Sequence, residues 1–208
     1  MKHRVFVWCG RVHEDVLTTA FRFLAQVRQA RAFHPRGILL RGELTGTAPF
    51  PASATVAVRL SKGAGTGPGW PDVFGVAFRV PTESGDWDVL LSTTGTGRLS
   101  RLLPTPVRGW RGARLGTLAP YRYRGELMWL MAVPDGAPPT RFTVHASGTD
   151  ADWRQIADVT LHPEDGAAAP IAFDPVLHRP PGMELAPRWL AVLREQAYEG
   201  SRRGRRDS

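Results

Sequence analysis

The segment Arg31–Gly37, which reads RAFHPRG, has the residue types of an acid–base site. His34 stands in it with Arg31 three positions before and Pro35 directly after. A free imidazole has a pKa of about 6.5 and can take up and return a proton during catalysis. A single histidine in such a position is more often structural than catalytic. His34 is therefore a candidate general acid or base that needs support from the rest of the chain.

Other catalytic motifs find no match. The glycine-rich run GAGTG (63–67) lacks the Lys-Ser/Thr pair of a phosphate-binding loop, so we interpret it as a flexible loop. The chain has no nucleophile elbow and no His-Glu-x-x-His sequence, and Asp150, Asp152 and Asp158 stand in turn-like or strand-edge contexts. The single cysteine, Cys9, excludes an internal disulfide and a cysteine-based zinc site.

The composition is typical of one soluble globular domain, with 208 residues of which 42% are hydrophobic and 22% charged. We therefore expect a single domain over residues 1–208. No stretch approaches the roughly 20 apolar residues of a membrane-spanning helix, and the N-terminal apolar run is too short for a secretory signal. These features predict a cytoplasmic location and no membrane span.

Part of the net charge of +8 comes from the basic tail at 202–208, which contains Arg202, Arg203, Arg205 and Arg206. Such a tail is most often a solvated end, and less often a nucleic-acid contact or part of an anion site. The sequence has no aromatic platform near the tail, so nucleic acid is not an expected partner.

The hydrophobic periodicity predicts the elements that must position these residues. Residues 14–30 carry apolar side chains at helical spacing and predict an amphipathic helix. A second helix is predicted over residues 188–200, between Pro187 and Gly200, after an irregular Pro-rich segment at 171–187.

Between the two expected helices the pattern changes to period two, which is typical of β-strands. The predicted strands are the eight short runs at 37–46, 54–61, 73–80, 87–93, 114–125, 126–134, 141–148 and 154–161. About eight strands with short connections suit a closed antiparallel barrel or a sandwich, and such a barrel holds side chains or one ligand in its lumen. The predicted class is α+β, with an antiparallel β-barrel over residues 37–161 flanked by an N-terminal helix and a C-terminal helix.

Three runs in this order resemble the haem-dependent catalase family. RAFHPRG is similar to the family's R-x-V-H-[AP]-[KR]-G, and VAVRLS (56–61) is similar to its VRFS. DVFGVAFRVPTESGDWD (72–88) follows the family's D-x-R-G-F-A-V-K-F-x-T-x-E-G-N-W-D without a gap. The family's tyrosinate pattern, R-x-x-x-Y with a later arginine, is matched by Arg194, Tyr198 and Arg205.

The resemblance implies haem b as the cofactor, with Tyr198 as the axial ligand of the iron. Arg194 stands four positions before Tyr198, on the same face of the predicted helix, where a guanidinium favours the phenolate form. The resemblance also implies that His34 is the acid–base group on the other side of the haem, and that Ser61 orients its imidazole by a hydrogen bond.

The same resemblance suggests a clamp for the haem propionates. Guanidinium groups pair well with carboxylates because their forked N–H groups match both oxygens. The implied members of the clamp are Arg31, Arg59 and Arg205.

The chain departs from the family pattern around the expected distal pocket. The family's asparagine follows the Trp-Asp strand, where this chain has Ser92 and Thr93, so we expect a hydroxyl in place of the amide and count Thr93 among the catalytic residues. The usual phenylalanine pair is replaced by TGTGRLSRL (94–102). Phe33 and Phe74 stand where the family has a small aliphatic residue and an arginine.

These features lead to a minimal haem-binding catalase-related protein as the first hypothesis, with peroxidase or organic-hydroperoxide chemistry rather than fast dismutation of hydrogen peroxide. Its substrate would be a peroxide or a lipid hydroperoxide, and the sequence is compatible with a homo-oligomer. The alternative hypothesis is a haem-free catalase-fold barrel that serves as a small-ligand binding or interaction module.

Overall fold

The computed structural model describes residues 37–63, 65–67, 69–162, 171–175 and 177–186. Its elements are β1 (Ile38–Gly46), β2 (Ser53–Lys62), β3 (Phe74–Thr82), β4 (Gly85–Thr93), the short 3-10 helix η1 (Ser100–Leu102), β5 (Leu115–Gly116), β6 (Tyr121–Tyr123), β7 (Glu126–Pro134), β8 (Arg141–Ser147), β9 (Arg154–His162) and β10 (Met183–Leu185). Burial alternates along the long strands. In β2, for example, Val56, Val58 and Leu60 are buried and the residues between them are not.

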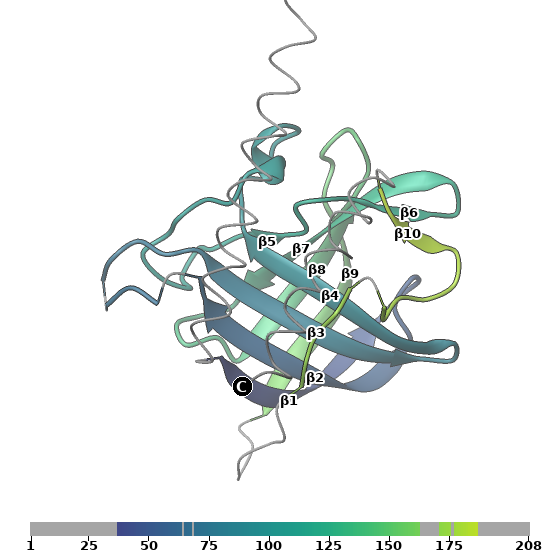
Figure 1. The fold of residues 1–208 in the computed structure, drawn as a ribbon, viewed down its shortest axis with the longest axis horizontal. Helices are drawn as coiled ribbons and strands as arrows, with labels where there is room; N and C mark the ends of the chain where they lie inside the picture. Colours follow the sequence, from purple (N-terminus) through teal and green to yellow (C-terminus); the bar gives the residue numbers. More distant parts are fainter. Residues whose placement is uncertain (1–36, 64, 68, 163–170, 176, 187–208) are drawn as a thin grey trace, which may run out of the picture.

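Eight strands close into an antiparallel barrel. Around the ring they follow the order β1, β2, β3, β4, β5, β7, β8 and β9, and β9 pairs back with β1. The strands β6 and β10 lie outside the ring, where β6 pairs with both β7 and β10 (Figure 1). The prediction of an eight-stranded antiparallel barrel is confirmed, and closure leaves the ring without a free edge.

The predicted α+β class is wrong. The described residues contain no α-helix, and their only helical element is the three-residue η1, so this part of the chain is all-β. The predicted strands of this region have the period-two pattern, and the segments between them were predicted to be loops or irregular chain. The two predicted helices, at 14–30 and 188–200, lie outside the described residues. In the described part of the chain no helix has the length and apolar character needed to span a membrane.

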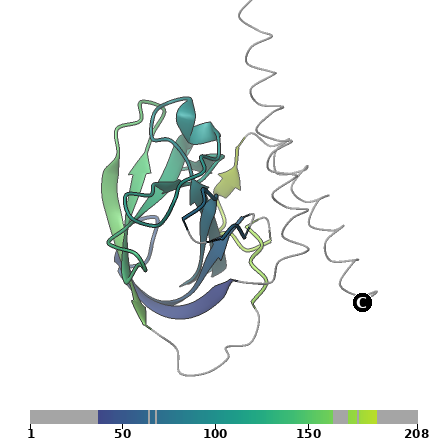
Figure 2. The ribbon, with the colours of Figure 1, turned by 90° about the vertical axis from the view of Figure 1, so that its left-hand side faces the viewer.

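Two strand predictions differ in detail. The run at 114–125 was expected to be one strand, but it forms β5 and β6 with Pro120 between them. Proline has no N–H to donate to a neighbouring strand, which explains the interruption. The segment 171–187, expected to be irregular, contains the short β10, which pairs with β6. Figure 2 shows the described part of this segment running along the outside of the barrel.

Side chains from all eight strands of the ring fill the lumen. Phe78 of β3 and Phe142 of β8 come from opposite sides of the ring, yet their ring centroids are 5.9 Å apart in an edge-to-face contact. Near one end, Trp87 is fully buried, stacked on Phe50 at 4.8 Å and in edge contact with Tyr121 at 5.6 Å. The lumen is therefore a packed core at these levels rather than a ligand cavity.

Replacement of Trp87 tests this core. We expect Trp87→Ala to lower the free energy of unfolding by about 3–5 kcal/mol, because it removes a fully buried indole and leaves a cavity. Urea denaturation followed by circular dichroism measures the loss. The matched control is Trp70→Ala, since Trp70 is 71% exposed, and it should change stability by less than about 0.5 kcal/mol. Equal losses in the two variants would contradict the assignment of the core.

Candidate ligand site on the outer face of the barrel

The outer faces of β2, β3 and β4 form a surface of mostly small side chains, which we call the outer floor. One row across the strands is Ser61, Gly75 and Ser92, and the next row is Arg59, Ala77 and Leu90. Directly paired residues of antiparallel strands point to the same side of a sheet. Their neighbours Leu60, Val76 and Leu91 belong to the core, so these two rows face away from it. Gly75 is buried and the other five floor residues are partly buried.

The structure separates the two predicted catalytic hydroxyls. Ser61 lies on the outer floor, and its Oγ donates a long hydrogen bond of 3.4 Å to the carbonyl oxygen of Gly75. Thr93 lies on the core side of β4, because successive strand residues point to opposite faces. Its side chain is buried and its Oγ1 has no hydrogen-bond partner. The hydroxyl that shares the floor with Ser61 is that of Ser92.

Arg59 connects the outer floor to the end of the RAFHPRG segment. A Cβ atom added to Gly37 would overlap the Arg59 side chain, so the glycine leaves room for this guanidinium. The last residue of the RAFHPRG segment therefore lies beside the floor.

The other predicted site residues lie outside the described part of the chain. They are Arg31, His34, Arg194, Tyr198 and Arg205. Their roles stay predictions, as does the role of Thr93. Among the described residues, the structure brings Arg59 and Ser61 together on one face of β2.

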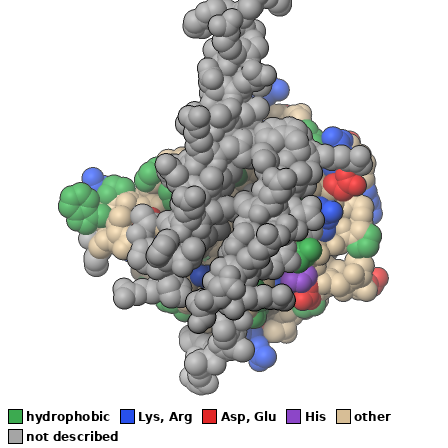
Figure 3. Space-filling model, viewed as in Figure 1, with side chains coloured by type: hydrophobic (Ala, Val, Ile, Leu, Met, Phe, Trp, Pro, Cys, Tyr) green, Lys and Arg blue, Asp and Glu red, His purple; other side chains and the backbone are tan. Residues whose placement is uncertain are grey.

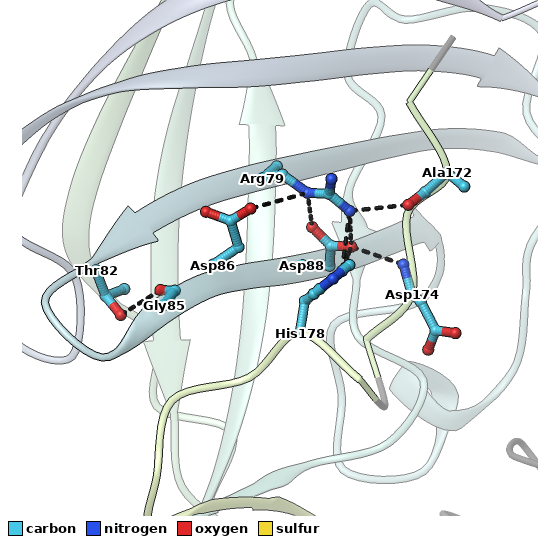
Figure 4. A network of polar contacts seen from close by, with 8 residues as sticks. All are labelled: Arg79, Thr82, Gly85, Asp86, Asp88, Ala172, Asp174 and His178. Atoms are coloured by element: carbon cyan, nitrogen blue, oxygen red, sulfur yellow. Dashed lines mark hydrogen bonds and ion pairs between the residues drawn. The ribbon is translucent and has the colours of Figure 1, made fainter.

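A buried ionic pair lies beside the outer floor, one row further along β3 and β4 (Figure 4). The Asp88 carboxylate is fully buried and accepts two hydrogen bonds from Arg79, 2.7 Å from Nε to Oδ1 and 2.6 Å from Nη2 to Oδ2. The hydrogen bond that Arg79 donates to Asp88 raises the pKa of Arg79, and this effect outweighs that of partial burial. The guanidinium is therefore charged, and this two-point contact is the strong form of an ion pair.

The same pair anchors the segment that follows the barrel. The backbone N–H of Asp174 donates to Asp88 Oδ2 at 2.6 Å, and Arg79 Nη2 donates to the carbonyl oxygen of Ala172 at 2.8 Å. His178 is held twice: its carbonyl oxygen accepts from the N–H of Asp88, and its Nδ1 lies 2.9 Å from both Asp88 Oδ2 and Arg79 Nη2. We call these contacts the Asp88 network. It fixes Ala172, Asp174 and His178 against β3 and β4.

Sequence reasoning did not assign a role to the Asp88 network. Arg79 and Asp88 were visible as charged residues between core positions of two neighbouring predicted strands, and such a charge needs a partner. That signal could have suggested their pairing. Nothing in the pattern indicated that Asp174 and His178, which come 86 and 90 residues after Asp88, would join them.

Comparison with known proteins agrees with this architecture. No protein-family model and no curated protein matches the chain. Among solved structures, the structure of a bacterial catalase is similar, with a TM-score of 0.56 and 17% sequence identity. The match covers 82% of this chain and 56% of the catalase chain, so the protein spans little more than half the length of that catalase. The chain therefore has a catalase-like fold, and the resemblance found in the sequence is confirmed at the level of the fold.

Removing the charge of Asp88 tests the anchoring role of the network. We expect Asp88→Asn to lower the free energy of unfolding by about 3–5 kcal/mol, because it removes the buried anion of Arg79. The remaining ion-pair partner, Asp86, is more exposed and lies 3.8 Å from Arg79 Nε. Limited proteolysis should then cut within residues 171–178, and chemical denaturation gives the energy. The matched control is Asp158→Asn in the more exposed Arg141–Asp158 pair, whose N···O distance is also 2.6 Å. This control should cost less than about 1 kcal/mol. A similar cost for both variants would contradict the assigned role.

Proposed function

We propose that the protein is a haem-binding, catalase-related protein that acts on peroxides, with the haem placed on the outer floor of the barrel. The observation that carries the proposal is the pair of rows formed by β2, β3 and β4. These rows present mostly small side chains, with Arg59 at their edge. The outer floor occurs in a catalase-like fold and lies beside the end of the RAFHPRG segment.

The described residues of the floor fit one face of a haem. A planar macrocycle needs a surface without large side chains at its centre, and Gly75 and Ala77 provide it in the middle strand. The propionate groups need cations, and Arg59 lies at the floor's edge as one member of the proposed clamp with Arg31 and Arg205. The packed lumen supports the same placement, since the side chains of Phe78 and Phe142 meet inside the barrel.

In this proposal, one group of the chain's residues holds the haem and another moves the proton of the peroxide. Tyr198 would hold the iron, and Arg194 would favour its phenolate form. A bound haem supplies the iron redox chemistry for cleaving an O–O bond. His34 would take a proton from one oxygen of the peroxide and return it to the other, which would leave as water or an alcohol. A hydrogen bond with Ser61 would orient the imidazole.

The position of Ser92 favours peroxidase or organic-hydroperoxide chemistry over fast dismutation of hydrogen peroxide. Ser92 stands in the row of Ser61, in the part of the chain where catalases have their distal asparagine. A serine hydroxyl is shorter than an amide and has one donor rather than two. The shorter side chain leaves more room above the floor for a substituted peroxide. It also offers fewer hydrogen bonds to position a second molecule of hydrogen peroxide.

Haem content tests the first step of the proposal. The full chain, produced with ample haem precursor, is expected to show a Soret band and close to one haem per chain by the pyridine haemochrome method. Tyr198→Phe should lose most of the haem while circular dichroism shows an intact barrel, because it removes the iron ligand. The matched control, Tyr123→Phe on β6, should keep its haem. A colourless, folded full chain that does not take up added haemin would support the haem-free binding module instead.

Peroxide cleavage tests the acid–base role of His34. We expect His34→Ala to retain haem and to slow the reaction with hydrogen peroxide and with cumene hydroperoxide by about 100-fold or more, because a positioned proton-transfer group is lost. Stopped-flow spectroscopy of the Soret band follows the reaction. The matched control is His162→Ala, which replaces an exposed histidine on β9. An unchanged rate in His34→Ala would remove His34 from the mechanism.

A further inference from the structure

The loop between β2 and β3 presents an indole to solvent. Trp70 in this loop is 71% exposed, more than any other large hydrophobic side chain in the described part of the chain. Tryptophan side chains are usually well buried, as Trp87 and Trp129 are in this protein. The exposure of Trp70 is unfavourable in water, and a partner surface that covers the indole would remove this cost.

The loop holds a defined shape around a buried carboxylate. Asp72 is only 3% exposed. Its Oδ2 accepts from the N–H and the Oγ1 of Thr66 at 2.9 and 3.0 Å, and its Oδ1 accepts from the N–H of Val73 at 2.7 Å. The backbone of Asp72 also forms two hydrogen bonds with Val107, of 2.9 and 2.8 Å. These contacts tie the loop to the segment around Val107 and hold Trp70 at its outer end.

The loop that carries Trp70 and the segment tied to it around Val107 are basic. Lys62, Arg108 and Arg111 are exposed, and Arg108 Nη1 lies 3.5 Å from the carbonyl oxygen of Gly69, next to Trp70 in the chain. The segments 62–71 and 103–114 contain no aspartate or glutamate. The carboxylate of Asp72 is engaged inside the loop. In Figure 3, hydrophobic and basic side chains protrude together at the left margin, where Figure 1 shows the β2–β3 loop.

We propose that the β2–β3 loop docks the protein on an anionic lipid surface, with Trp70 inserted at the interface and Lys62, Arg108 and Arg111 against the headgroups. Indole rings favour the boundary between headgroups and acyl chains, where the ring is covered and its N–H keeps a polar partner. A cation near an anionic bilayer adds about fivefold to binding at low salt. The proposal does not depend on haem binding.

The single ring favours a lipid surface over nucleic acid. Proteins that bind single strands stack successive bases on several aromatic side chains along a basic groove. Trp110 in the neighbouring segment is partly buried against the core, where its ring packs on Phe74 at 4.9 Å, so it adds no second platform. One exposed indole among cations matches the chemistry of insertion into a bilayer interface.

Vesicle sedimentation with the full chain tests the proposal. The probes are sonicated vesicles of phosphatidylcholine alone and of phosphatidylcholine with phosphatidylglycerol. We expect binding to the anionic vesicles that weakens as NaCl is raised, and at least about tenfold weaker partitioning for Trp70→Ala. The triple variant Lys62→Gln/Arg108→Gln/Arg111→Gln should lose a similar or larger factor on the anionic vesicles and little on the neutral ones.

Matched controls and a competition experiment complete the test. Leu177→Ala removes an apolar side chain that is 54% exposed near the Asp88 network, and Arg122→Gln removes an exposed cation on β6; both should bind like the unmodified chain. The proposal is overturned if the unmodified chain does not sediment with anionic vesicles, or if Trp70→Ala sediments unchanged. It is also overturned if a single-stranded oligonucleotide binds more tightly than the vesicles through the same Trp70 and basic side chains.

Discussion

The packed lumen of the barrel is the constraint on which the rest of the structure depends. All eight strands of the ring contribute to one apolar cluster, and Phe78 and Phe142 meet across it at 5.9 Å. Where the interior of a barrel is filled by side chains, a planar ligand of the size of a haem has no room there. Binding groups must then lie on the outer faces of the strands. The alternation along β2, β3 and β4 provides such outward-facing side chains, because each core residue is followed by one that points away from the lumen.

The outer face carries a second constraint, which is electrostatic. The Asp88 carboxylate is fully buried, and a charge in that position is stable only with an opposite charge and several hydrogen-bond donors around it. Arg79 supplies the charge, and the backbone of Asp174 supplies a further donor. Because that donor comes from the segment after the barrel, satisfying one carboxylate also places that segment.

Much of the barrel could be predicted because its signal is local. Period-two alternation, broken by Gly and Pro clusters, placed seven of the eight predicted strands within a few residues of their observed ends, and the run at 114–125 is the exception. The predictions failed where the deciding contact is remote. β10 exists because Met183–Leu185 pair with the edge of β6, and three residues are too few to show a periodicity of their own.

The α+β class was wrong for the described residues because it rested on two terminal segments that lie outside them. The outer floor was only partly foreseen: Ser61 and Arg59 were chosen through a family resemblance, whereas Thr93 was preferred over Ser92.

The sequence alone determined the order and number of the barrel strands, the polar or apolar character of each strand position and the likeness to catalases, since these features depend on residue type and spacing along the chain. Only the tertiary structure decided that Ser92, and not Thr93, shares a face with Ser61, because this depends on the register of β2, β3 and β4. It also decided which groups neutralise Asp88 and that Trp70 stays exposed among cations. Such facts depend on contacts between residues distant in sequence, and burial and charge compensation are properties of those contacts rather than of any local pattern.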